Sequence, residues 1–73
     1  MTIGQKIKEL RLERGLNKMQ LANRLCVDRG SVSNWEKDNN EPRLYALIGM
    51  ADIFGVTLDE LCCYTPNVSL QEG

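Results

Sequence analysis

The side chains that most often carry out catalysis or bind metal are scarce in this sequence. It contains no histidine, which is the commonest general base and the commonest metal ligand. The three cysteines, Cys26, Cys62 and Cys63, have no spacing that matches a set of zinc ligands. Their odd number disfavours a disulfide framework, and we expect Cys26 and Cys62 to be small buried hydrophobic residues. With neither a glycine-rich phosphate loop nor a nucleophile elbow, the sequence predicts no enzyme, no cofactor and no metal.

A second group of side chains offers hydrogen bonds rather than catalysis. Val32 and Trp35 stand at i and i+3, so they share the buried face of a helix predicted over residues 29–37. The other face of that helix carries short or forked polar groups that have no packing role. These are Arg29, Ser31, Ser33 and Asn34. This polar face is the strongest candidate for a functional surface.

Two helices before residue 29 must position that face. Thr2 and Gln5 have the spacing of a capping box, and Gly15 is suited to a left-handed helix end. Between them, apolar residues recur on one helical face at Ile3, Ile7 and Leu10. The first helix is therefore predicted over residues 3–14.

The second helix is short and lies directly before the polar face. Within the segment GLNKMQLA, Asn17 and Gln20 form another capping box, which predicts a helix over residues 18–25. Cys26 and Val27 then form a short connection, and Asp28 is the expected N-cap of the helix over 29–37.

The rest of the chain predicts two more helices and a tail. The loop after residue 37 is rich in Asp and Asn and ends at Pro42. A strongly apolar helix follows and ends at Gly55, and its pattern rests on Leu44, Leu47, Ile48, Ala51 and Phe54. Thr57 and Glu60 form a third capping box, for a helix over 58–63. The fold class is thus all-α, a compact five-helix domain over residues 1–63, with a loose tail over 64–73.

Charge is divided unevenly along a chain whose net charge is only −1. Residues 1–37 hold eight basic and four acidic side chains, a net of +4. Residues 38–73 hold one basic and six acidic side chains, a net of −5. The basic half carries the candidate surface, which suits an anionic partner on that side.

Length and hydropathy limit the remaining classes. Seventy-three residues form one domain, too short for a barrel or dinucleotide-binding enzyme. No apolar run of about 18 residues predicts a membrane span. No secretory leader follows Met1, so we expect a complete small cytoplasmic protein without membrane contact.

Taken together, these patterns resemble the lambda-type repressor and Cro family of helix-turn-helix DNA-binding domains, also called the xenobiotic-response-element family. The resemblance covers about residues 3–62 and rests on the joint pattern of the first helix, GLNKMQLA, VDRGSVSNWE and EPRLYALIGMADIFGVTLDELC. It implies a lambda-repressor-like fold, with the helix-turn-helix in the second and third helices, and double-stranded DNA as partner.

The resemblance also implies which side chains read DNA bases. The helix over 29–37 would lie in the major groove with its first turns on base edges. Arg29 can bond O6 and N7 of guanine, and Asn34 can bond N6 and N7 of adenine. Ser31 and Ser33 can reach a base or a phosphate, while Gly30 lets the backbone approach the DNA.

Other residues are implied to contact phosphate groups. Asn17 and Lys18 open the second helix, whose N-terminus would meet a phosphate. The loop after the recognition helix would lie along the DNA backbone, with the contacts Lys37, Asn39, Asn40 and Arg43.

Arg11 and Glu36 correspond to positions that family members often pair. Such an ion pair would join the first helix to the recognition helix and fix its orientation rather than bind DNA. Trp35, in phase with Val32, is interpreted as core rather than as a base-stacking platform.

Four positions depart from the family pattern. Cys26 stands where glycine is usual, so a positive φ there would strain the backbone. Lys18 replaces a common glutamine and retains only a charge role. Asp28 replaces a Ser or Thr cap; we expect it to cap well while repelling a nearby phosphate. Arg43 replaces a common serine cap of the fourth helix.

The leading hypothesis is a sequence-specific transcriptional regulator, a repressor, that binds a palindromic operator as a homodimer. The resemblance places the dimer interface at an exposed apolar end formed by Leu58, Leu61, Cys62 and Tyr64, together with the fourth and fifth helices. An antitoxin or other module that binds a partner protein through its acidic second half stays open as an alternative. A thiol-based function of Cys62 and Cys63 is a third reading.

Overall fold

Five α-helices make up residues 2–62, the part of the chain that the computed structural model describes. In chain order the helices are α1 (Ile3–Glu13), α2 (Lys18–Leu25), α3 (Arg29–Glu36), α4 (Leu44–Phe54) and α5 (Leu58–Cys62). No strand occurs within residues 2–62. The five predicted helices and the all-α fold class are confirmed, with helix ends within one residue of the predictions. The predicted tail over 64–73 lies outside the described residues.

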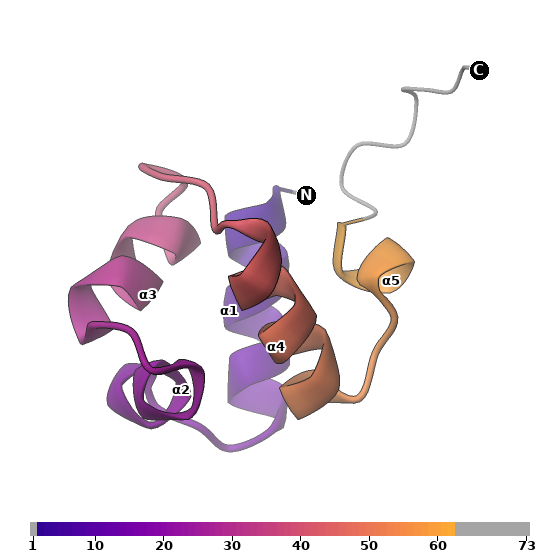
Figure 1. The fold of residues 1–73 in the computed structure, drawn as a ribbon, viewed down its shortest axis with the longest axis horizontal. Helices are drawn as coiled ribbons and strands as arrows, with labels where there is room; N and C mark the ends of the chain where they lie inside the picture. The colour runs from indigo at the N-terminus through magenta and orange to yellow at the C-terminus, as the bar shows by residue number, and fades with distance from the viewer. Residues whose placement is uncertain (1, 63–73) are drawn as a thin grey trace.

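The helices pack so that α2 and α3 project to one side of the domain. Figure 1 shows α4 crossing in front of α1, with α2 and α3 on one flank and α5 on the other. α3 packs on both α1 and α2, while α5 packs on α1 and α4. α3 is therefore supported from two directions, by α1 and by α2.

The core lies where the five helices meet. Its fully buried large side chains come from every helix: Phe54, Ile7, Leu21, Met50, Leu61 and Val32. Trp35 is 7% exposed and packs in the same cluster, which confirms its core assignment. Burial of such apolar area is the main force that holds helices as short as α2 and α3 in place.

Helix ends are secured largely by local polar contacts. Both hydrogen bonds of the predicted capping boxes are present at Thr2 with Gln5 and at Asn17 with Gln20. The same two bonds join Thr57 and Glu60, at 2.9 and 3.0 Å. Gly15 has φ of 70°, as predicted for a left-handed helix end.

Arg14 joins the C-terminal ends of α1 and α4. Its Nε donates to the carbonyl oxygen of Phe54 at 3.0 Å, and its Nη2 donates to the same oxygen. That carbonyl belongs to the last turn of α4, where intrahelical donors are lacking. The contact fixes α4 against α1 at the end of the domain away from Thr2.

The buried face of α4 differs from the apolar pattern of the sequence. The buried residues are Ala46, Met50, Ala51 and Phe54. Leu44, Tyr45 and Ile48 are instead 66%, 60% and 51% exposed. A helix that is apolar on nearly every side gives no contrast from which its inward face can be predicted. The exposed side of α4 is therefore an apolar surface.

Candidate nucleic-acid interface

The two faces of α3 differ in burial as the sequence predicts. Val32 is fully buried and Trp35 nearly so. On the other side Arg29 and Gly30 are exposed, while the smaller polar residues Ser31, Ser33 and Asn34 are half-buried. Helical periodicity alone places the five predicted base contacts on or beside one outward surface.

Asp28 occupies the N-cap position of α3, but its side chain makes no capping hydrogen bond. The expectation that Asp28 caps well is therefore wrong. The backbone carbonyl of Asp28 accepts from the amides of Ser31 and Val32, at 3.0 and 3.4 Å, so the turn closes through the main chain. Within residues 2–62, the first-turn amides of α3 consequently have no side-chain acceptor.

Asn17 and Lys18 stand at the start of α2, close to α3. The Oδ1 atom of Asn17 accepts from the backbone amide of Gln20 at 2.7 Å. The side-chain Nδ2 hydrogens of Asn17 therefore remain available. Lys18 extends its Nζ atom to the hydroxyl oxygen of Ser33, at 3.4 Å. This contact joins Lys18, a predicted phosphate contact in α2, to Ser33, a predicted base contact in α3.

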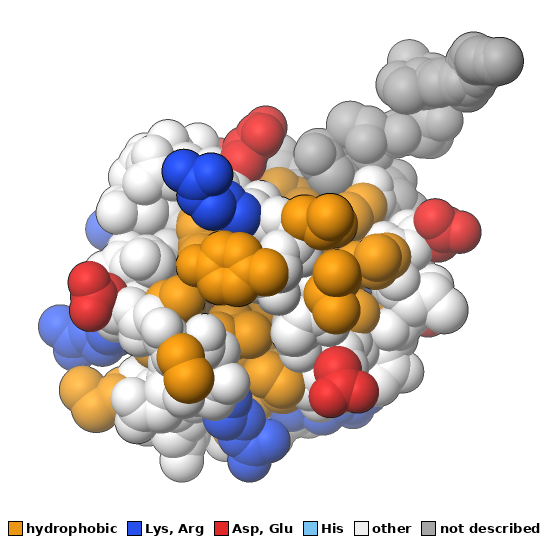
Figure 2. All heavy atoms as spheres, in the orientation of Figure 1, with side chains coloured by type: hydrophobic (Ala, Val, Ile, Leu, Met, Phe, Trp, Pro, Cys, Tyr) orange, Lys and Arg blue, Asp and Glu red, His pale blue; other side chains and the backbone are white. Residues whose placement is uncertain are grey.

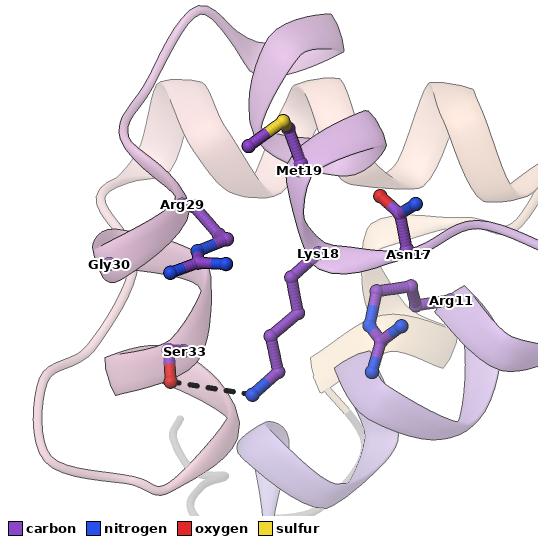
Figure 3. A pocket seen from close by; sticks show the side chains of 7 residues that line it. All are labelled: Arg11, Asn17, Lys18, Met19, Arg29, Gly30 and Ser33. Atoms are coloured by element: carbon purple, nitrogen blue, oxygen red, sulfur yellow. Dashed lines mark hydrogen bonds between the residues drawn. The ribbon is translucent and has the colours of Figure 1, made fainter.

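A hollow of about 790 Å³ lies between α2 and α3. It is lined by Arg11, Asn17, Lys18, Met19, Arg29, Gly30 and Ser33. Figure 3 shows the side chains of Lys18 and Arg29 directed into the space between the two helices. The hollow thus gathers five predicted DNA contacts, of which Lys18 and Arg29 are cationic. Met19, an apolar residue 54% exposed, is a lining residue that the sequence reasoning missed because one exposed methionine leaves no pattern.

The turn between α2 and α3 is strained at Cys26. This residue caps α2 with φ of 59° and ψ of 43°, the left-handed conformation that glycine adopts without cost. The strain anticipated for a non-glycine residue at this position is therefore present. Cys26 is also exposed, so its predicted burial is wrong: the left-handed turn directs the side chain away from the core. Cys62 is half-buried, and Cys63 lies outside the described residues.

Arg11 and Glu36 form the predicted ion pair between α1 and α3. Arg11 Nε donates to Glu36 Oε2 at 2.6 Å, and Arg11 Nη2 donates to Oε1 at 3.2 Å. A third donor, Nη1, bonds the carbonyl oxygen of Leu16 at 2.8 Å. The two side chains are only 7% and 3% exposed. The pair is therefore positioned to hold α3 against α1.

The loop after α3 exposes the remaining predicted phosphate contacts, Lys37, Asn39, Asn40 and Arg43. Arg43 precedes α4 without a side-chain cap, as its departure from serine suggests. Asp38 was not singled out from the sequence, yet its carboxylate accepts from Thr2 Oγ1 at 2.7 Å and from the Gly4 amide at 3.0 Å. These bonds span more than thirty residues of chain, so no local pattern indicates them.

The predicted dimer surface is only partly exposed. Leu58 is 38% exposed and Cys62 is half-buried, but Leu61 is fully buried. The expectation that Leu61 belongs to an exposed apolar end is wrong, because this residue fills the core between α5 and the rest of the bundle. Tyr64 lies outside the described residues. Figure 2 shows hydrophobic side chains gathered over α4 and toward α5, which includes the exposed side of α4, a helix that the predicted surface also included.

Residues 7–61 match the model of the helix-turn-helix family designated HTH_3. The chain belongs to this family. It is 33% identical over 72 residues to the HTH-type transcriptional activator BcrR of Enterococcus faecalis, covering 99% of this chain and 35% of that protein. It is 34% identical over 61 residues to the immunity repressor protein of Bacillus phage phi105, covering 84% of this chain and 42% of that protein. The chain spans at most half the length of these curated relatives.

Solved structures of the same architecture include two regulators. The restriction-modification controller protein C.AhdI from Aeromonas hydrophila superposes with a TM-score of 0.76 at 28% identity, covering 82% of this chain and 91% of that one. The P22 c2 repressor, solved in complex with a synthetic operator, gives a TM-score of 0.80 at 21% identity, with 85% and 94% covered. The second likeness concerns the fold alone, and both agree that the fold is lambda-repressor-like.

Other kinds of site find no support in the described part of the chain. Among residues 2–62, no three potential metal ligands of the His, Cys, Asp or Glu type come together. None of the helices in that range is both long and apolar enough to cross a bilayer.

Proposed function

We propose that this domain is the sequence-specific DNA-binding module of a transcriptional regulator and that α3 enters the major groove. The observation that carries the proposal is the outward polar face of α3, which shares a hollow with the cationic start of α2. A groove about 12 Å wide admits one helix with exposed side chains of this kind. The regulator names of the relatives support the same role.

Base recognition is assigned to the exposed and half-buried residues of α3. Arg29, at the first turn, has no hydrogen-bond or ion-pair partner within residues 2–62, so its forked guanidinium is available for guanine. Asn34 is placed for adenine, and Ser31 and Ser33 for shorter contacts. The absence of a side chain at Gly30 lets the backbone come close to the DNA; a Cβ there would meet no protein atom within 4 Å.

Phosphate contact is assigned to two regions that flank α3. At the start of α2, Asn17 and Lys18 line the same hollow as Arg29, and the Asn17 side chain keeps its Nδ2 hydrogens as donors. After α3, Lys37, Asn40 and Arg43 are exposed and supply charge or donors along the chain. Such contacts set the register on DNA and make affinity fall as salt rises. Asn39 was predicted to join this group, but its hydrogen bonds to Asn34 support a different role.

We further propose a homodimer on a palindromic operator. One small module makes few base contacts, and two copies double them across half-sites about 34 Å apart. Leu44, Tyr45 and Ile48 on α4, with Leu58 on α5, provide exposed apolar area away from the polar face of α3. Ile48→Lys should abolish dimerisation in sedimentation experiments while leaving the monomer folded, because Ile48 is 51% exposed. An unchanged dimer would assign the interface elsewhere.

Selection of bound sequences from a random DNA library tests recognition and symmetry together. We expect an enriched inverted repeat, and affinity for it well above that for random DNA. Arg29→Ala should then cost about 1–3 kcal/mol at one base pair in each half-site and relax the preference there. An equal loss on every sequence would instead identify Arg29 as a phosphate contact, and no enrichment with wild-type protein would refute sequence-specific binding.

Repression is the proposed outcome of operator binding, by occupation of a promoter. A reporter carrying the selected operator between promoter and gene should lose expression when the protein is present. Increased expression would show an activator instead. The relatives include both an activator and a repressor, so the module itself is compatible with either.

A second candidate function is supported by the exposed apolar side of α4. Three large apolar side chains, Leu44, Tyr45 and Ile48, suit a partner protein as well as a second copy. This is the antitoxin-like alternative, and it is compatible with DNA binding. Recovery of a stoichiometric heterologous partner that is lost with Ile48→Lys would support it; recovery of the homodimer alone would count against it.

A further inference from the structure

The chain reverses direction immediately after α3 through an unusual residue. Asp38 has φ of 61°, one of two positive-φ non-glycine residues within residues 2–62. Its amide donates to the carbonyl oxygen of Trp35 at 3.1 Å, so the chain folds back over the end of α3. Aspartate tolerates this left-handed conformation better than most residues, but still less well than glycine.

The Asp38 carboxylate anchors this reversal to α1. Its two oxygens accept from Thr2 Oγ1 at 2.7 Å and from the Gly4 amide at 3.0 Å. The Gly4 amide lies in the first turn of α1, where backbone amides have no acceptor within the helix. The helix dipole also favours a negative charge at this end. Contact is so close that a Cβ on Gly4 would lie 2.6 Å from Asp38 Oδ1 and would also strike the carbonyl oxygen of Trp35.

The next residue returns to α3 and contacts a proposed base-reading side chain. The backbone amide of Asn39 donates to the backbone carbonyl oxygen of Asn34 at 2.9 Å. The side-chain Nδ2 of Asn39 donates to Asn34 Oδ1 at 3.4 Å. In this side-chain bond the Asn34 oxygen faces Asn39 and keeps a second lone pair, while the two hydrogens of the Asn34 side chain remain available to a ligand.

We propose that Asn39 is a positioning residue for base recognition, which holds the Asn34 amide in one orientation while Asp38 anchors Asn39 to α1. A preorganised side chain loses less rotamer freedom when it binds, and an amide of fixed direction discriminates between base edges. The inference rests on the proposed function. It also replaces the phosphate contact predicted for Asn39 with a contact to another side chain of the protein.

The test compares Asn39→Ala with Asn40→Ala on the operator selected by the wild-type protein. Asn40 is its exposed neighbour, with no hydrogen bond to Asn34, and is the matched control. Asn34→Ala first identifies the base pair whose preference depends on Asn34. The measured quantity is the ratio of dissociation constants for the wrong and the right base at that pair.

We expect Asn39→Ala to lower this ratio about fivefold, the effect of one neutral hydrogen bond worth about 1 kcal/mol, while other base pairs keep their preferences. Asn40→Ala removes a proposed phosphate contact, so it should weaken binding to the right and the wrong base alike and leave the ratio unchanged. Asp38→Gly suits the left-handed backbone but removes the anchor, so it should lower the same ratio. Thermal unfolding of each variant shows that the protein is folded at the assay temperature, which separates orientation from stability.

Three results would overturn the inference. A ratio preserved in Asn39→Ala would show that Asn39 does not orient Asn34, and an equal loss on all sequences would show a phosphate contact. If Asn34→Ala changed the preference at no base pair, Asn34 would read no base. Failure of the proposed function is distinct, because wild-type protein would then select no sequence in the first place.

Discussion

Replacing Glu36 by glutamine would leave the charge of Arg11 without its counter-ion inside the protein. The side chains of Arg11 and Glu36 are 7% and 3% exposed, so water cannot replace the lost carboxylate. Removing one partner of such a buried pair costs about 3–5 kcal/mol. A core of this size supplies only about 3–5 kcal/mol in total. We therefore expect Glu36→Gln to be largely unfolded at 25 °C, or to melt at least about 12 °C lower.

Urea unfolding followed by far-UV circular dichroism and by Trp35 fluorescence measures this loss. Trp35 is the single tryptophan, and it is buried in α3 next to Glu36 in the sequence. Its fluorescence emission therefore reports on the packing of α3. The control is Glu9→Gln, because Glu9 pairs with Lys6 at 3.8 Å on the surface and its side chain is 47% exposed. That change should alter stability by no more than about 0.5 kcal/mol.

A double variant separates the interaction from the loss of a carboxylate. Arg11→Met with Glu36→Leu removes both charges and restores apolar volume, so it should recover most of the stability lost in Glu36→Gln. The reasoning would be refuted if the free energy of unfolding of Glu36→Gln lay within about 0.5 kcal/mol of that of the wild type. The ion pair would then be better solvated than its burial indicates.

Four further changes test the backbone in and around α3 by the same unfolding measurement. Cys26→Gly should stabilise the domain by about 1 kcal/mol because it relieves the strain of the left-handed conformation. Asp38→Gly relieves the same strain but loses two hydrogen bonds, so it should give no net gain in stability. Equal gains at both positions would contradict the role of the Asp38 carboxylate. Gly4→Ala should destabilise by about 1–3 kcal/mol, since the new methyl group has no room. Gly30→Ala should instead add about 0.5–1 kcal/mol through helix propensity while weakening operator binding, and unchanged binding would remove Gly30 from the interface.

Features that depend on neighbouring residues followed correctly from the sequence. The capping box at Asn17 and Gln20 is complete because both of its hydrogen bonds lie within one turn. The inward positions of Val32 and Trp35 followed from helical periodicity on a helix with a contrasting polar face. Arg11 and Glu36 were paired through the family resemblance, since their separation in sequence carries no local signal.

Features that depend on tertiary context could not be predicted from the sequence. Asp28 has the right residue type for a cap, but its side chain does not turn back toward α3, so residue type alone overstated the local bond. Leu44 and Ile48 belong to an apolar pattern whose inward side is decided by the partners of α4. Asp38 acts on Thr2 and Gly4 across the fold, and only the packing of α3 on α1 brings those residues together.

The outward side chains of α3 can be exchanged without disturbing what holds the helix. Arg29 and Gly30 are exposed and contribute nothing to the core, while Val32 and Trp35 anchor the opposite side. Under the proposed function, substitutions at Arg29 or Gly30 in duplicated copies of the gene would change operator preference at little cost to folding. The same separation would allow an engineer to graft other side chains onto the outer face of α3 while retaining the buried ion pair and core.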